Sequence, residues 1–579
     1  MTNSTANATS TSVHGSPAGA GAETEPHRSA DQVIEALTEA GVQYVFGIPG
    51  AKVDAVFDAF NDGGPELIVC RHEQNAAFMA AAVGRLTGTP GVVLVTSGPG
   101  TTNLATGLLT ATTEQDPVVA LAGAVQLSDR LKRTHQSMDA AAFLTTVTKS
   151  TTESTDPDDV REAVTNAFRA ASTEPKGAAA VVLSASVLAA AATPLPRGRT
   201  ANPSPALGPA PADDIARAAD LIRAAERPVL LVGLRGSDPE SVRALRALLA
   251  DTELPVVETF QAAGLVSREL EDHYLGRVGL FKNQPADLAL TESDLIVAVG
   301  YDAVEYDPVI WNAEVDRPVV HIDTVPAAYD RHYRPALELR GGIAATIDAL
   351  LPAVSGLTLS DDARRRAAEH REQLTAIDDH ARTADAAPGL VDPARLVLTL
   401  RDLLDDDATV ACDMGSNYIF MARHFRVYEP RHLLFSNGQQ TLGVALPWAM
   451  AAALLRPGTQ IVSVAGDGGF LFSAQELETA NRLGLSLTQI IMRDNAYNMV
   501  AFQEELKYGR TSGIQLGDYD STALAKAFDG TGRRVSTLAD FETALRASLD
   551  EPGVSIIDVA VDYSRNAEIA AHLDADSFE

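Results

Sequence analysis

The stretch AGDGGF, residues 465–470, places one carboxylate, Asp467, among three glycines directly after an apolar run. A second carboxylate, Asp494, follows the apolar run LTQIIMR. Two carboxylates that converge repel each other unless a cation lies between them, and Mg²⁺ typically takes one or two carboxylates together with phosphate oxygens. Glycines let backbone N–H groups approach an anion. The alternative is that Asp467 merely forms a turn, as Asp often does between glycines.

For Asp467 and Asp494 to meet, the two apolar runs must be neighbouring parallel strands joined by a helix. Ser473-Ala-Gln-Glu476 has capping-box spacing and predicts a helix of about nine residues that stops near Gly484. The usual crossover makes the strands parallel, so their carboxyl ends share the sheet edge where α/β folds bind ligands. A P-loop has no support, because the sequence contains no GxxxxGK[ST].

Similar alternation of strand-length apolar runs and helical stretches continues along the chain and predicts three doubly wound parallel-sheet α/β domains. The expected divisions are a disordered tail (1–28), a first domain (29–190), a proline-rich linker (191–212), a second domain (213–355), a charged helical linker (356–392) and a third domain (393–579). The expected strands lie at 66–70, 91–96, 117–123, 227–233, 293–300, 317–323, 408–413, 460–466, 487–494 and 554–561.

Composition limits the partners of the chain. A formal charge of -31 over 579 residues argues against a nucleic-acid or anionic-membrane partner. No apolar run reaches the roughly 18 residues that a membrane helix needs. Cys70 and Cys412 are too far apart in sequence for a disulfide framework. The tail lacks the features of a secretory signal, so a cytoplasmic protein is expected.

Gly466-Asp467-Gly468 followed by Asp494-Asn495 resembles the signature of thiamine-diphosphate enzymes. Longer stretches in all three domains are similar to the catabolic acetolactate synthases, and the resemblance covers residues 31–562. These stretches are HEQNAAFMAAAVGRLTG, TSGPGTTNLATGLLTATTEQDPVVALAG, DRLKRTHQSMD, GLFKNQPADL, GYDAVEYDP, TLGVALPWAM and GDGGFLFSAQELETA. The resemblance implies pyrimidine-binding, central and diphosphate-binding domains, in that order.

The implied activity is that of a transferase, an acetolactate synthase of the acetoin and butanediol pathway. Pyruvate is decarboxylated on thiamine diphosphate, and the hydroxyethyl carbanion adds to a second pyruvate to give 2-acetolactate and CO₂. The resemblance implies Mg²⁺ held by Asp467, Asp494 and the carbonyl of Ala496.

Glu73 in Cys70-Arg-His-Glu-Gln-Asn75 matches the family's activating glutamate. A carboxyl group bonded to N1′ of the cofactor favours the imino tautomer that generates the reactive carbanion. Taken alone, a glutamate in the first turn of a helix is usually only a favourable charge. The family takes this glutamate from a partner subunit, so the resemblance implies a homodimer as the minimal active unit and a homotetramer as the assembly.

Other implied contacts follow from the matched motifs. The residues implied to bind the cofactor are Gly98, Pro99, Gly100, Asn103, Gly415, Ser416, Asn417, Gln440, Leu442, Gly466, Gly468, Gly469, Tyr497 and Met499. The residues implied to meet pyruvate are Lys52, Gln136, Gln439 and Gln503. Gln136 is also implied to act near the reacting carbons; its plain alternative is a loop glutamine, and that of Lys52 is a solvated lysine.

Biosynthetic acetohydroxyacid synthases, which bind FAD, differ at two places. They carry Arg-Phe-Asp-Asp-Arg where this chain has GYDAVEYDP, residues 300–308, and a tryptophan where it has Gln503. We therefore expect no FAD and pyruvate as both donor and acceptor. Gln439 replaces the methionine expected in catabolic enzymes and leaves the packing there open. The alternatives are an FAD-containing biosynthetic enzyme, another thiamine-diphosphate decarboxylase or oxidase, and a scaffold without turnover.

Overall fold

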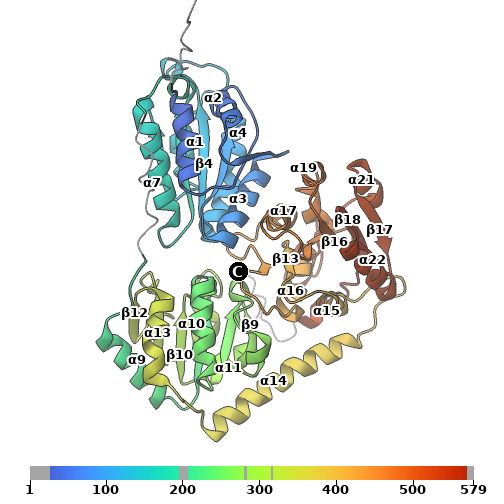
Figure 1. The fold of residues 1–579 in the computed structure, drawn as a ribbon. Helices are drawn as coiled ribbons and strands as arrows, with labels where there is room; N and C mark the ends of the chain where they lie inside the picture. The colour runs from blue at the N-terminus through green and yellow to red at the C-terminus, as the bar shows by residue number, and fades with distance from the viewer. Residues whose placement is uncertain (1–26, 195–205, 280–282, 314–316, 570–579) are drawn as a thin grey trace, which may run out of the picture.

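The structure, a computed structural model, describes residues 27–194, 206–279, 283–313 and 317–569. The tail predicted over 1–28 lies outside this range except for its last two residues. Within the described ranges the chain forms three six-stranded sheets in which every strand pair is parallel. Figure 1 shows three lobes, with the long helix α14 (Asp361–Arg382) running from the second lobe to the third.

The first sheet has the strand order β2-β1-β3-β4-β6-β5. Its strands are β1 (Tyr44–Gly47), β2 (Glu66–Val69), β3 (Gly91–Val95), β4 (Val118–Ala124), β5 (Ser150–Ser154) and β6 (Ala178–Ser184). Its helices are α1 (Ser29–Glu39), α2 (Asp54–Ala59), α3 (Glu73–Thr87), α4 (Pro99–Asn103), α5 (Ala105–Thr113), α6 (Ala140–Leu144), α7 (Val160–Ser172) and α8 (Ala185–Leu188).

The central sheet has the order β12-β11-β10-β7-β8-β9, so the chain reverses direction across the sheet between β7 and β10. Its strands are β7 (Pro228–Val232), β8 (Val256–Thr259), β9 (Tyr274–Val278), β10 (Leu295–Val299), β11 (Val319–Asp323) and β12 (Leu337–Arg340). Its helices are α9 (Ala212–Ala224), α10 (Pro239–Ala250), α11 (Pro285–Glu292), α12 (Pro308–Asn312) and α13 (Ile343–Val354).

The third sheet, β14-β13-β15-β16-β18-β17, repeats the strand order of the first. Its strands are β13 (Thr409–Cys412), β14 (Leu433–Leu434), β15 (Ile461–Gly466), β16 (Leu487–Arg493), β17 (Thr531–Val535) and β18 (Val554–Ala560). Its helices are α15 (Pro393–Leu403), α16 (Ser416–His424), α17 (Ala445–Leu455), α18 (Asp467–Leu471), α19 (Glu476–Arg482), α20 (Asn498–Tyr508), α21 (Ser521–Ala527), α22 (Leu538–Asp550) and α23 (Asn566–Ile569).

The three-sheet architecture confirms the predicted fold class, and a strand lies at each of the predicted strand positions. The capping box predicted at Ser473 is wrong. Helix α19 begins only at Glu476, and its N-cap residue, Gln475, makes no side-chain cap bond. The Ser473 hydroxyl instead lies 2.9 Å from Asn75 Oδ1 and 2.5 Å from the carbonyl oxygen of Gly443. The Ser473 hydroxyl is therefore bonded to acceptors distant in sequence, whereas its local spacing predicted that it would cap the helix.

Helices α3 and α17 join the first and third lobes through one continuous apolar core. Both helices are rich in alanine, which lets their backbones approach closely. The approach is tight also behind α3, where a Cβ on Gly91 would lie 2.0 Å from the carbonyl oxygen of Ala80. Arg85 closes the end of this interface over the ring of Trp448, 4.6 Å from its centroid, and pairs with Asp116 at 2.8 Å. Among the described residues, no helix is long and apolar enough to cross a membrane.

Candidate active site

A cavity of about 220 Å³ opens at the carboxyl edge of the third sheet. It is lined only by residues that follow β13 in the chain. They are Met414, Gly415, Ser416, Asn417, Tyr418, Gln440, Leu442, Gly466, Asp467, Gly468, Gly469, Met492, Asp494, Ala496, Tyr497, Asn498, Met499, Val500, Gln503 and Tyr563. The sequence-predicted cofactor residues of the third domain are thus gathered in one place.

Asp467 and Asp494 reach this cavity from neighbouring strands. Strand β15 pairs with β16 in parallel register, Gly466 opposite Met492, so the residues after each strand meet at one edge. The backbone N–H of Asn495 donates to Asp467 Oδ2 at 2.7 Å. Asn498 Nδ2 donates to Asp494 Oδ2 at 2.6 Å. Both carboxylates are therefore held in fixed orientations before any ligand binds.

The electrostatics of this pair favour a bound cation. Burial raises the pKa of Asp467, and burial together with the charge of Asp467 raises the pKa of Asp494 to about 6. Burial thus makes the charged form of each carboxylate unfavourable, and a cation between the two would offset this free-energy cost. The described residues contain no group of three or more His, Cys, Asp or Glu side chains suited to a metal. Two carboxylates suit Mg²⁺, which completes its shell with phosphate oxygens and water.

The N-terminus of α16 lines the same cavity as the two carboxylates. Its N-cap, Gly415, has a φ of 142° and no side chain to cap the first N–H groups. Asn417 Nδ2 donates to the carbonyl oxygen of Asp413 at 2.8 Å, which fixes this turn. Uncapped N–H groups at the start of a helix bind phosphate groups. The cavity therefore fits a diphosphate bridged to a divalent cation.

Sequence reasoning missed several residues that organise this cavity. Asp413 is buried, burial raises its pKa to about 7, and it accepts the N–H of Gly443 at 2.9 and 3.0 Å, so it anchors the loop that carries Leu442. Asn566, beyond the last strand, donates to Ser416 Oγ at 3.1 Å and to Asn498 Oδ1 at 2.7 Å. Of these residues, only Asn498 could have been linked to the site from local sequence. It stands four residues after Asp494, to which its side chain donates.

The predicted residues of the first domain form a second cluster at the ends of β2 and β3. Asn103 Nδ2 donates to Glu73 Oε2 at 2.9 Å. A Cβ on Gly98 would lie 3.0 Å from the Cβ of Gln136, whose backbone has a φ of 62°. Glu73 is half-buried, and Asn103 and Gln136 are exposed. None of these residues lines the cavity of the third domain, so one chain holds the two predicted halves of the site in separate places.

The predicted substrate residues also divide between these places. Gln503 lines the cavity of the third domain, as do Gln440 and Leu442. Gln439 does not; its Nε2 donates to Thr113 Oγ1 of the first domain at 2.9 Å. Lys52 lies in the first domain near Gly123, at the end of β4.

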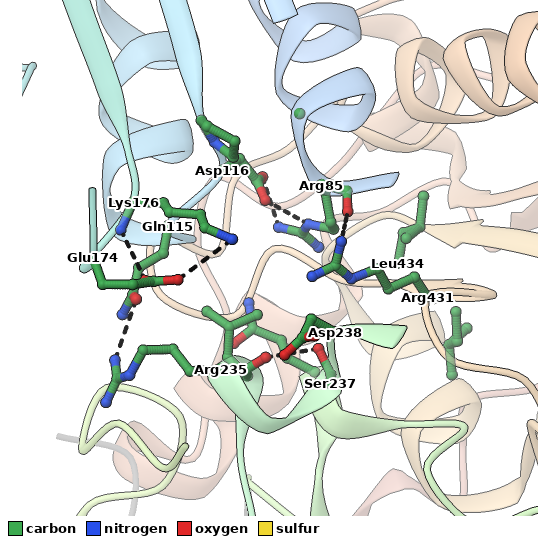
Figure 2. Close-up of a pocket in the computed structure, with 15 residues that line it drawn as sticks. Arg85, Gln115, Asp116, Glu174, Lys176, Arg235, Ser237, Asp238, Arg431 and Leu434 are labelled. Atoms are coloured by element: carbon green, nitrogen blue, oxygen red, sulfur yellow. Dashed lines mark hydrogen bonds and ion pairs between the residues drawn. The ribbon is translucent and has the colours of Figure 1, made fainter. Parts of the chain in front are cut away.

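A smaller cavity of about 50 Å³ lies where the three lobes meet (Figure 2). Its charged side chains are engaged within the protein: Arg85 pairs with Asp116, and Lys176 pairs with Glu174 at 3.3 Å. Asp238 caps helix α10 by accepting two backbone N–H groups. This cavity is much smaller than the cavity of about 220 Å³ in the third domain.

Comparison with protein families agrees with this arrangement of two binding halves around a central domain. Residues 27–143 match the thiamine pyrophosphate enzyme N-terminal TPP binding domain, residues 215–350 the central domain, and residues 413–559 the C-terminal TPP binding domain. The chain is therefore a thiamine-diphosphate-dependent enzyme.

Whole-chain relatives define the family more narrowly. The chain is 50% identical to an acetolactate synthase of Bacillus subtilis (strain 168) over 94% of its own length and 95% of the relative's. It is 44% identical to a catabolic acetolactate synthase of Raoultella terrigena, over 94% and 97% of the two chains. Identity falls to 31% with the isozyme 2 large subunit of Escherichia coli (strain K12). The chain belongs to the acetolactate synthase family.

Proposed function

We propose that the protein is an FAD-independent catabolic acetolactate synthase that condenses two pyruvates into 2-acetolactate in the cytoplasm, on a route to acetoin. The observation that carries this proposal is the cavity of the third domain, where Asp467 and Asp494 face the uncapped N-terminus of α16. In this proposal the two carboxylates and the carbonyl of Ala496 hold Mg²⁺. The N–H groups around Gly415 bind the diphosphate.

When bound, thiamine diphosphate supplies an electron sink for breaking and forming bonds at the carbonyl carbon of a 2-oxo acid. Glu73 would hold a proton at the aminopyrimidine of the cofactor, and the backbone carbonyl of Gln440 would accept a hydrogen bond from its amino group. Leu442, half-buried in the cavity wall, would pack against the bound cofactor. Gln136 and Lys52 orient the pyruvate carboxylate, and Gln503 borders the acceptor.

A second copy of the chain completes the site in this proposal. The cavity of the third domain contains no first-domain residue, and the Glu73 cluster lies on the surface of its own lobe. Large apolar side chains are exposed beside both halves: Leu471, Phe472 and Val500 near the cavity, and Leu109 and Leu131 on the first domain. Exposed apolar patches of this kind mark protein interfaces. A two-fold dimer would cover both patches and bring Glu73 of one chain to the cavity of the other.

Complementation between two inactive chains tests this shared site. We expect Glu73→Gln and Asp467→Ala homo-oligomers to be nearly inactive. Hetero-oligomers, co-expressed with two affinity tags and purified on both, should regain about half of the wild-type rate, because one of two sites then has both residues. The matched control places both substitutions in one chain paired with wild-type, which leaves no intact site. Inactive hetero-oligomers, or an active control, would contradict the proposal.

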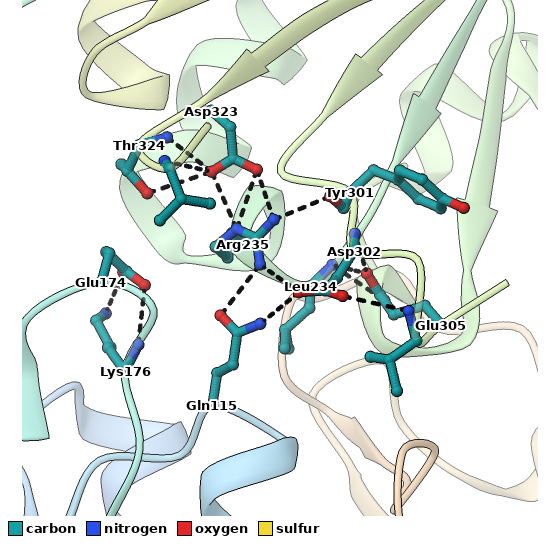
Figure 3. Close-up of polar contacts among 12 residues, drawn as sticks. Gln115, Glu174, Lys176, Leu234, Arg235, Tyr301, Asp302, Glu305, Asp323 and Thr324 are labelled. Carbon is teal, nitrogen blue, oxygen red and sulfur yellow. Dashed lines mark hydrogen bonds and ion pairs between the residues drawn. The ribbon is translucent and has the colours of Figure 1, made fainter. Parts of the chain in front are cut away.

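The central domain gives a geometric reason to expect no FAD. Open α/β sheets bind nucleotides where the strand order reverses, here between β7 and β10. The protein's own side chains occupy this place (Figure 3). Glu305, 1% exposed, accepts the backbone N–H of Leu234 at 2.9 Å, where a phosphate would bind. Arg235 pairs with Asp323 at 2.8 Å and with Asp302 at 2.7 Å across the strand ends.

A product assay tests the activity and the cofactor requirement together. Purified protein given pyruvate, thiamine diphosphate and Mg²⁺ should form acetolactate, measured as acetoin after acidification. Added FAD should leave the rate unchanged, and the protein should show no flavin absorbance. A yellow flavin spectrum would favour the biosynthetic or oxidase alternative. Acetaldehyde as the sole product would favour a decarboxylase.

A further inference from the structure

Helix α19 of the third domain holds the segment that connects β2 to α3, the segment that presents Glu73. Glu476, the first residue of α19, is completely buried. Its Oε1 accepts the backbone N–H of Arg71 at 2.9 Å and that of His72 at 3.0 Å. It also lies 3.2 Å from Asn75 Nδ2, in the first turn of α3. One carboxylate from the third domain therefore bonds both residues before Glu73 and the side chain two residues after it.

Asn75 also connects this segment, through hydrogen bonds, to the loop beside the cofactor cavity of its own chain. Asn75 Oδ1 lies 2.9 Å from the Ser473 hydroxyl, which also reaches the carbonyl of Gly443. Gly443 follows Leu442, and its N–H is held by Asp413. Buried side chains thus link the loop beside the cavity to the N-terminus of α3. The stretch from Asp467 to Glu476 contains both the metal-binding carboxylate and the carboxylate that holds α3.

We propose that Glu476 is a positioning residue for Glu73 of its own chain, and that through it the cofactor-binding segment of one subunit sets the activating glutamate used by its partner. This inference rests on the proposed role of Glu73. Among the described residues the Glu73 side chain bonds Asn103 of the same domain, so its direction depends on how the start of α3 is fixed. Three bonds to a buried carboxylate fix it more firmly than neutral acceptors would, because charge-assisted hydrogen bonds are about twice as strong.

The inference is tested first in cofactor-free protein, where no turnover is involved. Replacing Glu476 by alanine leaves the N–H groups of Arg71 and His72 without their acceptor. We expect faster amide hydrogen exchange at residues 71–76 of the first domain, with exchange in the strands of the third sheet unchanged. Glu476→Gln retains the Oε1 acceptor and should restore most of the protection. Glu476→Asp keeps the charge but withdraws the acceptor from both N–H groups, and it replaces the alanine variant if that protein fails to fold. Wild-type exchange at residues 71–76 in the folded alanine or aspartate variant would overturn the inference.

The second readout is the bound cofactor itself. In Glu476→Ala, displacement of Glu73 should lower kcat about 10- to 100-fold, as small misplacements of a reacting group do. Affinity for thiamine diphosphate should be retained. The circular-dichroism bands of the 4′-amino and 4′-imino tautomers should shift toward the amino form. The control is Glu551→Gln, which changes an exposed glutamate of the third domain paired with Arg533. An unchanged tautomer ratio, or a loss of cofactor affinity as large as the loss of kcat, would indicate a merely structural role and overturn the inference.

Mixed oligomers show on which subunit Glu476 acts. An Asp467→Ala chain paired with a Glu476→Ala chain has one cavity with intact Asp467 facing a correctly held Glu73, so about half of the wild-type rate is expected. If Glu476 served the cavity of its own chain, this hetero-oligomer would be inactive, and the inference would fail. Failure of the proposed function is distinguishable, because Glu73→Gln would then retain full activity whatever the Glu476 variants do.

Discussion

Glu73→Gln should reduce kcat for acetolactate formation by about 10²- to 10⁴-fold, the usual contribution of a general acid or base. An amide has the same size and can still donate an N–H hydrogen bond to N1′, but unlike a carboxylic acid it cannot transfer a proton to that nitrogen. Affinity for thiamine diphosphate should therefore stay within a few-fold of wild type. The rate is measured from acetoin after acidification, and the affinity by calorimetry.

The matched control is Glu66→Gln, which changes an exposed glutamate on β2 of the same domain and should retain the wild-type rate. Retained folding is checked by an unchanged melting temperature, expected because Glu73 is only half-buried and bonds Asn103 alone. A Glu73→Gln enzyme with wild-type kcat would remove Glu73 from the mechanism, whatever its affinity for the cofactor.

Asp467→Ala should weaken the binding of Mg²⁺ and thiamine diphosphate by about 100-fold or more, since even indirect metal contacts contribute 10- to 100-fold. One of two metal-binding carboxylates is lost, and Asp494 alone leaves the diphosphate charge poorly compensated. Thermal unfolding gives the measurement. Added Mg²⁺ and cofactor should raise the melting temperature of the wild type through mass action and leave that of the variant nearly unchanged.

Two variants sharpen this result. Asp467→Asn keeps the acceptor for the Asn495 N–H but loses the charge, so its affinity should lie between those of the alanine variant and the wild type. Asp518→Ala, which removes an exposed carboxylate paired with Arg534, should bind normally. Wild-type cofactor affinity in Asp467→Ala would refute the assignment of the metal site.

The part of the fold that could be predicted is the part that depends on sequence patterns spanning only a few residues. Apolar runs of strand length report burial over a few residues, so they located ten strands, at least three in each sheet, and left the others, such as β1, β5 and β14, unlocated. The charged helical linker predicted over 356–392 contains α14. The position of Asp494 followed in the same way: a short crossover between parallel strands brings Asp467 and Asp494 to one sheet edge. Glu73 begins α3 as its position after a strand predicted.

The sequence by itself thus determined ten of the strands and the sheet edge where Asp467 and Asp494 meet, because these depend on local periodicity and on a short crossover. The reacting side chains were implied by the family resemblance and stay a prediction. The tertiary structure decided which partner each polar side chain takes. Ser473 had the spacing of a helix cap, yet its hydroxyl meets Asn75, 398 positions away in sequence. Glu476 likewise bonds backbone N–H groups 404 and 405 positions away. No local sequence pattern predicts such contacts, since they depend on the packing of α3 in the first lobe against α17 in the third.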